Sequence, residues 1–499
     1  MKGILFLLCL VSSFCPAQTN WKSDTLILAG KVLHHEKYKD NKSVKFSFHN
    51  IFGEGIPLVA ILDEEGNFRT GKTIYYPQEF YLHFGNHTSL FASPGDSLYI
   101  EIDADILEDA GNNQPNGKYF TQIKGGSSKM VNDEISRFIA SLPDAKTLYG
   151  NQQEAVKTMS PEEYKIYINK REELFKAYLS TFKESTETSR LFDKWVNDKI
   201  QYQTLADLMR YRWLHANSNG WPMDSIELPE SYFSFLAKHE TNDQEVISVP
   251  HFDFLNELYR YSQSFPTDSV KRMMSFFKQK DIIKGANVLL NMLQKNSSGF
   301  THDVFLTRFY LDALYGQQLN EFEILYDSAN IKNMLFRELI FQEHQKLLLY
   351  LANQDTEGAT LTKINSNIDL SVLDSILIKY LDKVVYIDFW APWCAPCMQE
   401  MPFSKEIQKQ FEGKDVVFLF IASQCSNESW KATIANKKLT GEHIIITDDQ
   451  FNVLSAKLGI SGIPHYTLID RNGNIAFRNA ARPSDNENLT KEIQKLMKK

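Results

Sequence analysis

The stretch VVYIDFWAPWCAPCMQEMP, residues 384–402, decides the fold of the last part of the chain. Its first part, residues 384–389, is an apolar run with the length and β-branched character of a buried strand. Cys394 and Cys397 follow, and the residues after them are compatible with a helix. The stretch therefore predicts a C-x-x-C dithiol where a strand turns into a helix, and such a dithiol suits redox chemistry.

The N-terminus has the pattern of an export signal. Lys2 precedes an apolar run at residues 4–11, and small or polar residues follow as far as Ala17. The run is too short for a membrane span of about 20 residues, so residues 1–17 are predicted to be a cleaved signal peptide. Acylation of Cys15 is the less favoured alternative, because bulky Phe14 precedes it. We expect an exported protein of the periplasm or cell envelope, either soluble or associated with the membrane.

The small number of cysteines helps to distinguish a catalytic role from a structural one. Two of the five, Cys9 and Cys15, lie in the signal region, which leaves Cys394, Cys397 and Cys425. Exported proteins usually use cysteines as structural staples, whereas one close pair in a long chain favours catalysis. An inert disulfide or half of a zinc site is the alternative, but zinc requires two further ligands and no second C-x-x-C motif is present. We therefore expect a redox pair with no metal and no cofactor, and we interpret Cys425 as a free thiol.

Length and charge narrow the classes of function. A chain of 499 residues exceeds one ordinary core, so two or three domains are expected. The net charge of −8 and the pI near 5.9 argue against non-specific nucleic-acid binding, which needs a basic surface.

Three patterns follow one another along the chain. Residues 20–124 alternate apolar and polar side chains and predict a β-sandwich-like domain. Residues 125–353 carry apolar side chains at helical spacing and predict an all-helical domain. Residues 354–370 are polar and are interpreted as a linker, after which strand and helix patterns alternate. The third domain, residues 354–499, is therefore predicted to contain an α/β sheet with crossover connections.

Two motifs in the last quarter of the chain resemble those of a known family. They are Asp-Phe-Trp-Ala-Pro-Trp-Cys-Ala-Pro-Cys at residues 388–397 and Gly-Ile-Pro at residues 462–464. Both are similar to motifs of thioredoxin-fold domains of the TlpA/ResA type, which occur in exported bacterial thiol–disulfide oxidoreductases. The resemblance implies a cis-proline loop at Pro464 and a TlpA-type helix–strand insertion between Cys397 and Pro464.

The predicted helix assigns different roles to the two cysteines. Cys394 would lie at the first turn, where unpaired backbone N–H groups and the helix dipole favour a negative charge. This position lowers a thiol pKa from about 8.5 towards about 7 or below, so Cys394 is predicted to be the nucleophile. Cys397 lies three residues later on the same helix face and is predicted to resolve the mixed disulfide.

Two carboxylates flank the pair. Asp388 ends an otherwise apolar strand, so burial should raise its pKa and suit it to general acid–base catalysis. The resemblance implies that it assists proton transfer at the resolving cysteine. Glu400 lies one turn beyond Cys397 and matches the acidic residue that follows C-x-x-C in ResA-like proteins. The alternatives are a partly solvated strand end for Asp388 and a surface carboxylate for Glu400, and the presence of both acids departs from a family branch that often lacks the aspartate.

Three residues are expected to dock the substrate. The resemblance implies that Ile463, before Pro464, offers its backbone N–H and C=O to an extended client segment. Trp393 is expected to shield the thiol and shape the docking surface, with a pure packing role as the alternative. His465 stands where the family commonly has Thr, which leaves the substrate preference open.

The sequence therefore predicts an exported thiol–disulfide oxidoreductase that acts on disulfide-containing protein clients. The resemblance implies reduction of those clients, a membrane thiol donor of electrons, and cytochrome maturation as one setting. The rival prediction is an extracytoplasmic binding or assembly protein in which residues 20–353 capture a partner and the redox domain is accessory. A thiol peroxidase is a third alternative, but peroxidatic sites carry Thr and Pro upstream of a single cysteine.

Overall fold

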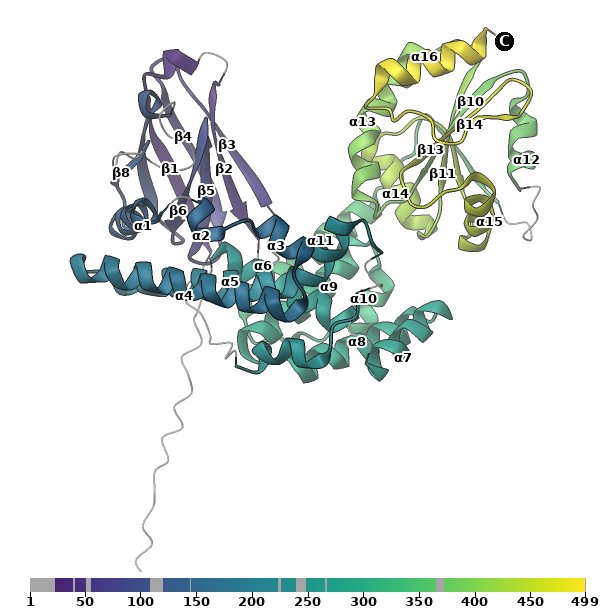
Figure 1. Ribbon diagram of the computed structural model, residues 1–499. Helices are drawn as coiled ribbons and strands as arrows, with labels where there is room; N and C mark the ends of the chain where they lie inside the picture. Colours follow the sequence, from purple (N-terminus) through teal and green to yellow (C-terminus); the bar gives the residue numbers. More distant parts are fainter. Residues whose placement is uncertain are drawn as a thin grey trace, which may run out of the picture. The chain divides into compact units, whose positions relative to one another are not determined.

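The computed structural model describes residues 23–38, 41–50, 55–107, 120–143, 145–222, 226–238, 248–264, 267–364 and 372–498 (Figure 1). The chain divides into two compact units, Met1–Arg308 with Asp327–Arg337, and Phe309–Tyr326 with Glu338–Lys499. The predicted signal peptide lies outside the described residues. Within the described ranges, no helix is long and apolar enough to cross a membrane.

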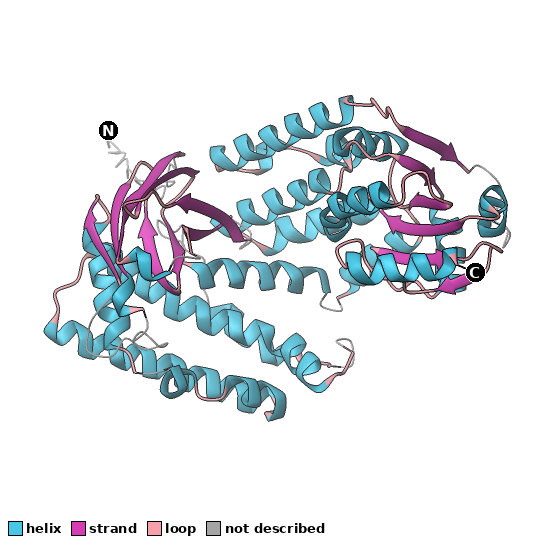
Figure 2. Cartoon of the chain, turned by 90° about the horizontal axis from the view of Figure 1, so that it is seen from above, coloured by secondary structure: helices cyan, strands magenta, loops and turns pink. Residues whose placement is uncertain are grey.

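Two four-stranded sheets make up the beginning of the first unit (Figure 2). Their strand orders are β4-β1-β7-β8 and β3-β2-β5-β6, and β1 pairs parallel with β7 while the other neighbours pair antiparallel. Alternate side chains of both sheets, such as Leu28 and Phe46, meet in one apolar core. The strands are β1 (Asp24–Leu33), β2 (Ser43–His49), β3 (Gly55–Ile61), β4 (Asn67–Ile74), β5 (Gln78–Phe84), β6 (Asn86–Ala92), β7 (Ser97–Asp103) and β8 (Thr121–Gly125).

Helices follow these sheets, and α9 and α11 contribute residues to both units. The described part of residues 129–352 contains no strand, in agreement with the helical spacing of its apolar residues. The helices are α1 (Lys129–Ser141), α2 (Ala145–Tyr149), α3 (Gln152–Thr158), α4 (Pro161–Ser185), α5 (Arg190–Asn219), α6 (Val249–Ser264), α7 (Asp268–Lys278), α8 (Ile282–Asn296), α9 (Gly299–Tyr315), α10 (Leu319–Leu325) and α11 (Met334–Ala352). Short 3₁₀ helices are η1 (His35–Tyr38), η2 (Ala104–Ile106), η5 (Glu230–Lys238), η6 (Ser328–Asn330) and η7 (Ile378–Tyr380).

Local signals fix the ends of the two longest helices. The capping box at the start of α4 pairs Ser160 with Glu163, and Pro161 occupies the first turn, where its missing N–H costs nothing. The helix α5 begins at the cap Ser189 and ends at Gly220, whose φ of 67° is a left-handed conformation that glycine adopts without strain.

A buried ion pair joins α4 to α5. The guanidinium of Arg171 donates to the carboxylate of Asp207, and the two side chains are only 4% and 6% exposed. Gln152 accepts from Arg171 at 3.0 Å, and Gln203 donates to Asp207 at 3.0 Å. These bonds satisfy both charges, so neither can be removed alone without leaving the other buried and unpaired.

The second unit is built on a six-stranded sheet of order β14-β13-β10-β11-β12-β9. The strand β10 lies inside it, parallel to β11 and antiparallel to β13, and every residue of β10 is buried. The elements are β9 (Ala359–Lys363), α12 (Val372–Leu377), β10 (Val384–Trp390), α13 (Ala395–Gln410), β11 (Val416–Ala422), α14 (Asn427–Lys437), β12 (Gly441–Ile445), α15 (Asp448–Leu458), β13 (His465–Ile469), β14 (Ile475–Phe477) and α16 (Asn486–Met497).

Helices cover both faces of this sheet. Val384, Tyr386 and Trp390 share one core with side chains of α13, α14 and α16. The intervening residues of β10 share a second core with side chains of α12 and α15. Because side chains alternate along a strand, Asp388 lies on the face that α13 covers.

One sequence-based prediction about this unit is wrong. The polar residues 354–370 predict a linker, but Ala359–Lys363 form β9, which pairs in parallel with β12 at the edge of the sheet. An edge strand is open to water along one side, so its polar composition resembles that of a linker. The division into three domains with boundaries at residues 124 and 353 stays a prediction.

The buried pair of Arg171 and Asp207 yields a stability prediction. Asp207→Ala should lower the free energy of unfolding of the first unit by about 3–5 kcal/mol, because it leaves a buried guanidinium uncompensated. Lys176→Ala is the matched control: it breaks an ion pair with Glu172 in which the lysine side chain is 60% exposed, and should cost about 0.5 kcal/mol or less.

Urea unfolding followed by circular dichroism measures both changes. The double variant Arg171→Met with Asp207→Leu should recover most of the loss, since apolar side chains of similar volume can replace a buried pair. Equal losses for Asp207→Ala and Lys176→Ala would contradict this account.

Candidate active site at the Cys394–Cys397 disulfide

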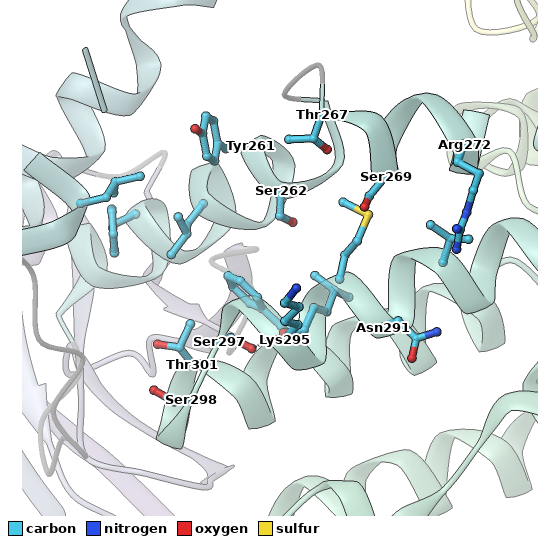
Figure 3. A pocket seen from close by; sticks show the side chains of 17 residues that line it. Tyr261, Ser262, Thr267, Ser269, Arg272, Asn291, Lys295, Ser297, Ser298 and Thr301 are labelled. Carbon is cyan, nitrogen blue, oxygen red and sulfur yellow. Dashed lines mark hydrogen bonds between the residues drawn. The ribbon is translucent and has the colours of Figure 1, made fainter. Parts of the chain in front are cut away.

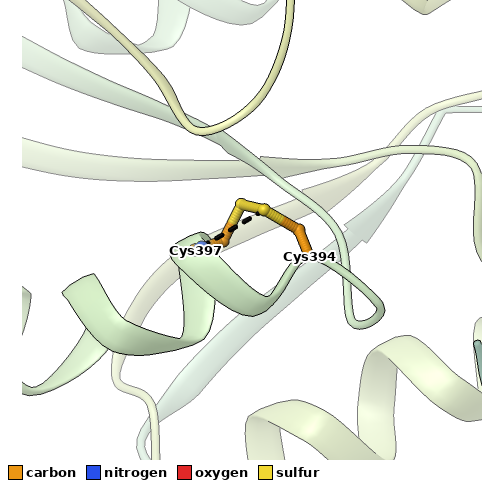
Figure 4. Close-up of a disulfide and its surroundings, with 2 residues drawn as sticks. All are labelled: Cys394 and Cys397. Carbon is orange, nitrogen blue, oxygen red and sulfur yellow. Dashed lines mark hydrogen bonds between the residues drawn. A yellow bond between two sulfur atoms is a disulfide. The ribbon is translucent and has the colours of Figure 1, made fainter. Parts of the chain in front are cut away.

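Cys394 and Cys397 form a disulfide at the start of α13 (Figure 4). Cys394 is the N-cap residue, and its Sγ accepts a hydrogen bond of 3.2 Å from the backbone N–H of Cys397. The two residues are 3% and 1% exposed. In the reduced state the same N–H and the helix dipole would stabilise a thiolate on Cys394, which is the sulfur that the sequence predicts to be nucleophilic.

Asp388 lies inside β10, on the face covered by α13, and is 2% exposed. Among the described residues, its Oδ1 has no hydrogen-bond partner. Burial, assisted by the nearby charge of Glu400, raises the pKa of Asp388 to about 8. The carboxyl group is therefore mostly protonated, and neutral, below about pH 8. The apolar character of the strand predicts this raised pKa.

Glu400 is held on the buried side of α13. Its two carboxylate oxygens accept hydrogen bonds of 2.9 Å from the backbone N–H and from the hydroxyl of Ser484. The two bonds hold the Glu400 side chain in place on α13, and its charge acts on Asp388. Ser484 is 84 residues away in sequence, and no local motif points to it.

Two tyrosines complete the buried surroundings of Asp388. Tyr466 lies directly opposite Asp388 in the register of β13 and β10 and stacks on Tyr386, with ring centroids 5.6 Å apart. The hydroxyl of Tyr386 donates to the carbonyl of Ala481 at 2.9 Å, whereas that of Tyr466 has no partner among the described residues. Burial is the main reason that the pKa values of both tyrosines are raised. The sequence analysis missed these residues, although their spacing along apolar strands was visible.

The predicted docking residues lie beside this centre. The Ile463–Pro464 bond is cis, and β13 starts at the next residue, His465, which pairs with Phe389 of β10. Burial lowers the pKa of His465 from its ordinary value. Trp393 is 41% exposed, and its indole N–H donates to the carbonyl of Gln424 at 2.8 Å. Trp393 therefore presents an anchored aromatic surface.

Cys425 follows Gln424 in the loop that holds Trp393. It is half-buried and not disulfide-bonded. Burial, with a further contribution from the charge of Asp448, raises the pKa of the Cys425 thiol to about 12. The free thiol that the sequence predicts is thus a poorly ionised one.

One group of side chains outside this site has the geometry of metal ligands. The ligand atoms of His34, Asp103 and Asp105 lie within 4.8 Å of one another. Lys37 Nζ lies 2.6 Å from Asp105 Oδ1, and the His34 ring lies within 3.3 Å of both carboxylates. Lys37 already pairs with Asp105 in this partly exposed group, so we assign no metal to it.

A family model described as thioredoxin-like matches residues 382–475. The C-terminal part of the chain is a thioredoxin-like domain. It is similar to the thiol-disulfide oxidoreductase ResA of Geobacillus thermodenitrificans, with 29% identity over 116 residues, 21% of this chain and 60% of the relative. Thioredoxin 1 of Nostoc sp. is 46% identical over 50 residues, 10% of this chain and 41% of the relative.

Solved structures also match the thioredoxin-like domain. The thioredoxin domain of a thiol-disulfide oxidoreductase from Bacteroides vulgatus is 26% identical and covers 24% of this chain and 84% of that chain, with a TM-score of 0.22. The chain spans 60% of the length of the first curated ResA relatives that it matches. The family model and the ResA relatives together indicate that residues 382–475 are homologous to thioredoxin-like thiol–disulfide oxidoreductase domains.

The pKa of Asp388 makes the stability of the thioredoxin-like domain depend on pH. The pKa is raised from 3.8 to about 8, so the folded state holds a proton that the unfolded state releases as the pH rises between these values. The contribution of Asp388 to stability is therefore highest below about pH 4 and declines until about pH 8. Replacement by Asn removes this dependence.

We expect Asp388→Asn to stabilise the oxidised chain increasingly from about pH 4 to about pH 8, with a plateau above. Urea unfolding at a series of pH values measures the difference. When both chains carry Glu400→Gln, the difference between the chains with and without Asp388→Asn should reach its plateau at lower pH, because Glu400→Gln removes the charge that assists burial in raising the pKa of Asp388. Glu406→Gln, on the exposed side of α13, is the matched control and should shift nothing. A difference between wild type and Asp388→Asn that is constant with pH would refute the assignment.

Proposed function

We propose that this protein is an exported thiol–disulfide oxidoreductase that reduces disulfides of protein clients through Cys394 and Cys397. The observation that carries the proposal is the position of the Cys394 sulfur, which caps α13 and accepts the N–H of Cys397. A sulfur in this position is stabilised as a thiolate, and the thiolate is the form that attacks a disulfide.

The reaction transfers two electrons from the dithiol to the client. The Cys394 thiolate attacks one sulfur of the client disulfide, which forms a mixed disulfide and releases the other client sulfur as a thiolate. The Cys397 thiolate then attacks the Cys394 sulfur, which releases the second client thiolate and leaves the Cys394–Cys397 disulfide. Each released thiolate takes up a proton, and the oxidised enzyme must be reduced again by a thiol donor.

Asp388 is proposed to take the proton from the Cys397 thiol. With a pKa of about 8, Asp388 is ionised in about a tenth of the molecules at pH 7, and this carboxylate form is the proton acceptor. Because that pKa lies close to the ordinary thiol pKa of about 8.5, the transfer to the ionised carboxylate costs less than about 1 kcal/mol. Trp393 and the backbone of Ile463 before Pro464 are proposed to dock the client next to Cys394, with the client segment added as a strand beside the cis-proline loop.

Export, electron supply and family branch are part of the same proposal. The apolar run at residues 4–11 supports a signal peptide and hence a periplasmic or cell-envelope location. A membrane thiol donor would then keep the pair reduced, and cytochrome maturation is one such setting. We also propose that α14 and β12, which lie between Cys397 and Pro464 in sequence, are the TlpA-type insertion.

A binding or assembly function for the first unit is the second candidate. A cavity of about 790 Å³ is lined by residues of α6, α7, α8 and α9 (Figure 3). Its walls include apolar side chains such as Phe254 and Met292, and the charged residues among those that line it are Arg272 and Lys295. A cavity of this size lies within the range of small-molecule sites, and its many hydroxyl-bearing lining residues, such as Ser262, suit a polar ligand. The proposal for this unit is that it captures a partner for which the redox domain is accessory.

The three cysteine variants of the full chain test the proposed mechanism. Cys394→Ser should abolish the reduction of insulin by dithiothreitol above background, since it removes the nucleophile. Cys397→Ser should accumulate mixed disulfides with client proteins, because nothing resolves them. Cys425→Ser is the matched control and should change neither result.

Non-reducing electrophoresis detects the trapped complexes, and insulin turbidity reports the rate. Full activity of Cys394→Ser would sink the mechanism. A measured reduction potential near about −120 mV would reject the reductive direction alone, since that end of the thioredoxin-like range belongs to oxidants. Clients retained without a covalent bond by Cys394→Ser would favour the binding function.

A further inference from the structure

Residues of α11 and of the turn between α9 and α10, which precede the thioredoxin-like domain in sequence, form hydrogen bonds with its helix α14. The hydroxyl of Ser429, in the first turn of α14, donates to the side-chain carbonyl of Gln317, which lies between α9 and α10. The hydroxyl of Tyr350 in α11 donates to Thr433 Oγ1 at 3.1 Å. All of these residues belong to the second compact unit.

Further bonds extend this contact along α14. Asn436 donates to the backbone carbonyl of Tyr350 at 2.8 Å and accepts from the side chain of Asn353 at 3.1 Å. Gln354 donates to the backbone carbonyl of Glu428 at 3.2 Å. Side-chain hydrogen bonds therefore run from the first turn of α14 to its last turn and hold the turn after α9 and the end of α11 beside α14.

The contact between α14 and these residues lies close in sequence to the loop that holds Trp393, next to the Cys394–Cys397 disulfide. Gln424, whose carbonyl holds the Trp393 indole, is five residues before Ser429, which bonds to Gln317. The chain from Gln424 to Ser429 consists of three extended residue-to-residue steps and two helical ones, and these five steps span about 14 Å at most.

A protein client covers about 800 Å² on its partner, which corresponds to a disc about 16 Å in radius. The side-chain hydrogen bond between Ser429 and Gln317 adds roughly 10 Å, so the whole path of about 24 Å is still shorter than the disc's diameter of about 32 Å. A protein whose contact area includes Trp393 can therefore also contact the turn between α9 and α10.

Backbone conformation points to the same two positions. Gln317 and Gln424 both have a φ of 55°, a left-handed conformation in which glycine is less strained. Each glutamine accepts a hydrogen bond: the side-chain carbonyl of Gln317 accepts from Ser429, and the backbone carbonyl of Gln424 accepts from Trp393. Both loops are thus held in defined shapes, and a preorganised surface loses less entropy when a partner binds.

We propose that residues 315–318, between α9 and α10, form part of the client-binding surface of the redox centre, and that the partner is a folded protein with a surface disulfide. Tyr315 is 50% exposed at this turn, and exposed aromatic side chains are frequent anchors of protein interfaces. A small disulfide would not reach the turn. The inference rests on the proposed oxidoreductase function and adds the kind of client and a second contact for it.

The test compares two surface variants of the full chain with two substrates. Tyr315→Ala should lower kcat/KM for a folded protein disulfide about fivefold or more, because it removes an interface aromatic. The rate with a small aromatic disulfide, such as dithiobis-nitrobenzoate, should stay unchanged. Phe341→Ala is the matched control: Phe341 is 56% exposed on α11 and about 13 Å before Tyr350 along the helix, so it should affect neither substrate.

A second measurement tests the inference without a substitution in residues 315–318. In the complex trapped through Cys394 by Cys397→Ser, amide hydrogen exchange of residues 312–320 should be slower than in the free chain. Unchanged exchange there, equal effects of the two surface variants, or a parallel loss with the small disulfide would overturn the inference. If the wild-type chain reduces neither substrate in a Cys394-dependent way, the proposed function itself fails, which is a different result.

Discussion

The redox centre depends on one constraint: a carboxyl group sits in a strand that is buried on both faces. Burial keeps Asp388 protonated at neutral pH, and the charge of Glu400, fixed by Ser484, reinforces that state. On the other side of the dithiol, the N-terminus of α13 favours negative charge at Cys394. The site thus places a backbone N–H at the sulfur that we propose as the nucleophile, and inside the sheet it holds a carboxyl group that is mostly protonated at neutral pH and accepts a proton only in its minor ionised form.

Much of this arrangement was predictable from sequence because its signals are local. The apolar run at residues 384–389 and the C-x-x-C motif define a strand and a helix start without reference to the rest of the chain. The alternation in the first hundred residues likewise predicts strands, and two sheets around a common core are present. Pro464 was expected in a cis bond from its motif, and the bond is cis.

The rest of the centre is set by contacts between distant residues. The sequence predicts Glu400 as the acidic residue after the C-x-x-C motif and leaves a surface carboxylate as the alternative. In the structure Ser484, at a separation of 84 residues, holds Glu400 on the buried side of α13, and neither residue carries a motif for the other. Tyr466 meets Asp388 only through the pairing of β13 with β10. The strand β9 was missed because an edge strand and a linker have similar polar compositions. Contacts between distant segments, such as strand pairing, cannot be predicted from the local pattern of either segment alone.

The chain is also more continuous than its three sequence patterns suggest. The helices α9 and α11 contribute residues to both compact units, and α14 carries side-chain bonds to the helices before the thioredoxin-like domain. The connection from α11 to β9 is only six residues, 353–358. The end of α9, α10 and most of α11 therefore belong to the compact unit that contains the thioredoxin-like domain, although no motif in them would associate them with it.

The environment of Cys425 has a consequence for the electron count of each turnover. A thiol with a pKa of about 12 is ionised in about one molecule in 10⁵ at pH 7. It therefore competes very slowly for a mixed disulfide formed nearby, since exchange proceeds through the thiolate. In the proposed cycle, a third cysteine can therefore remain in the loop that supports Trp393 without exchanging with the mixed disulfide, so that each cycle would deliver one pair of electrons.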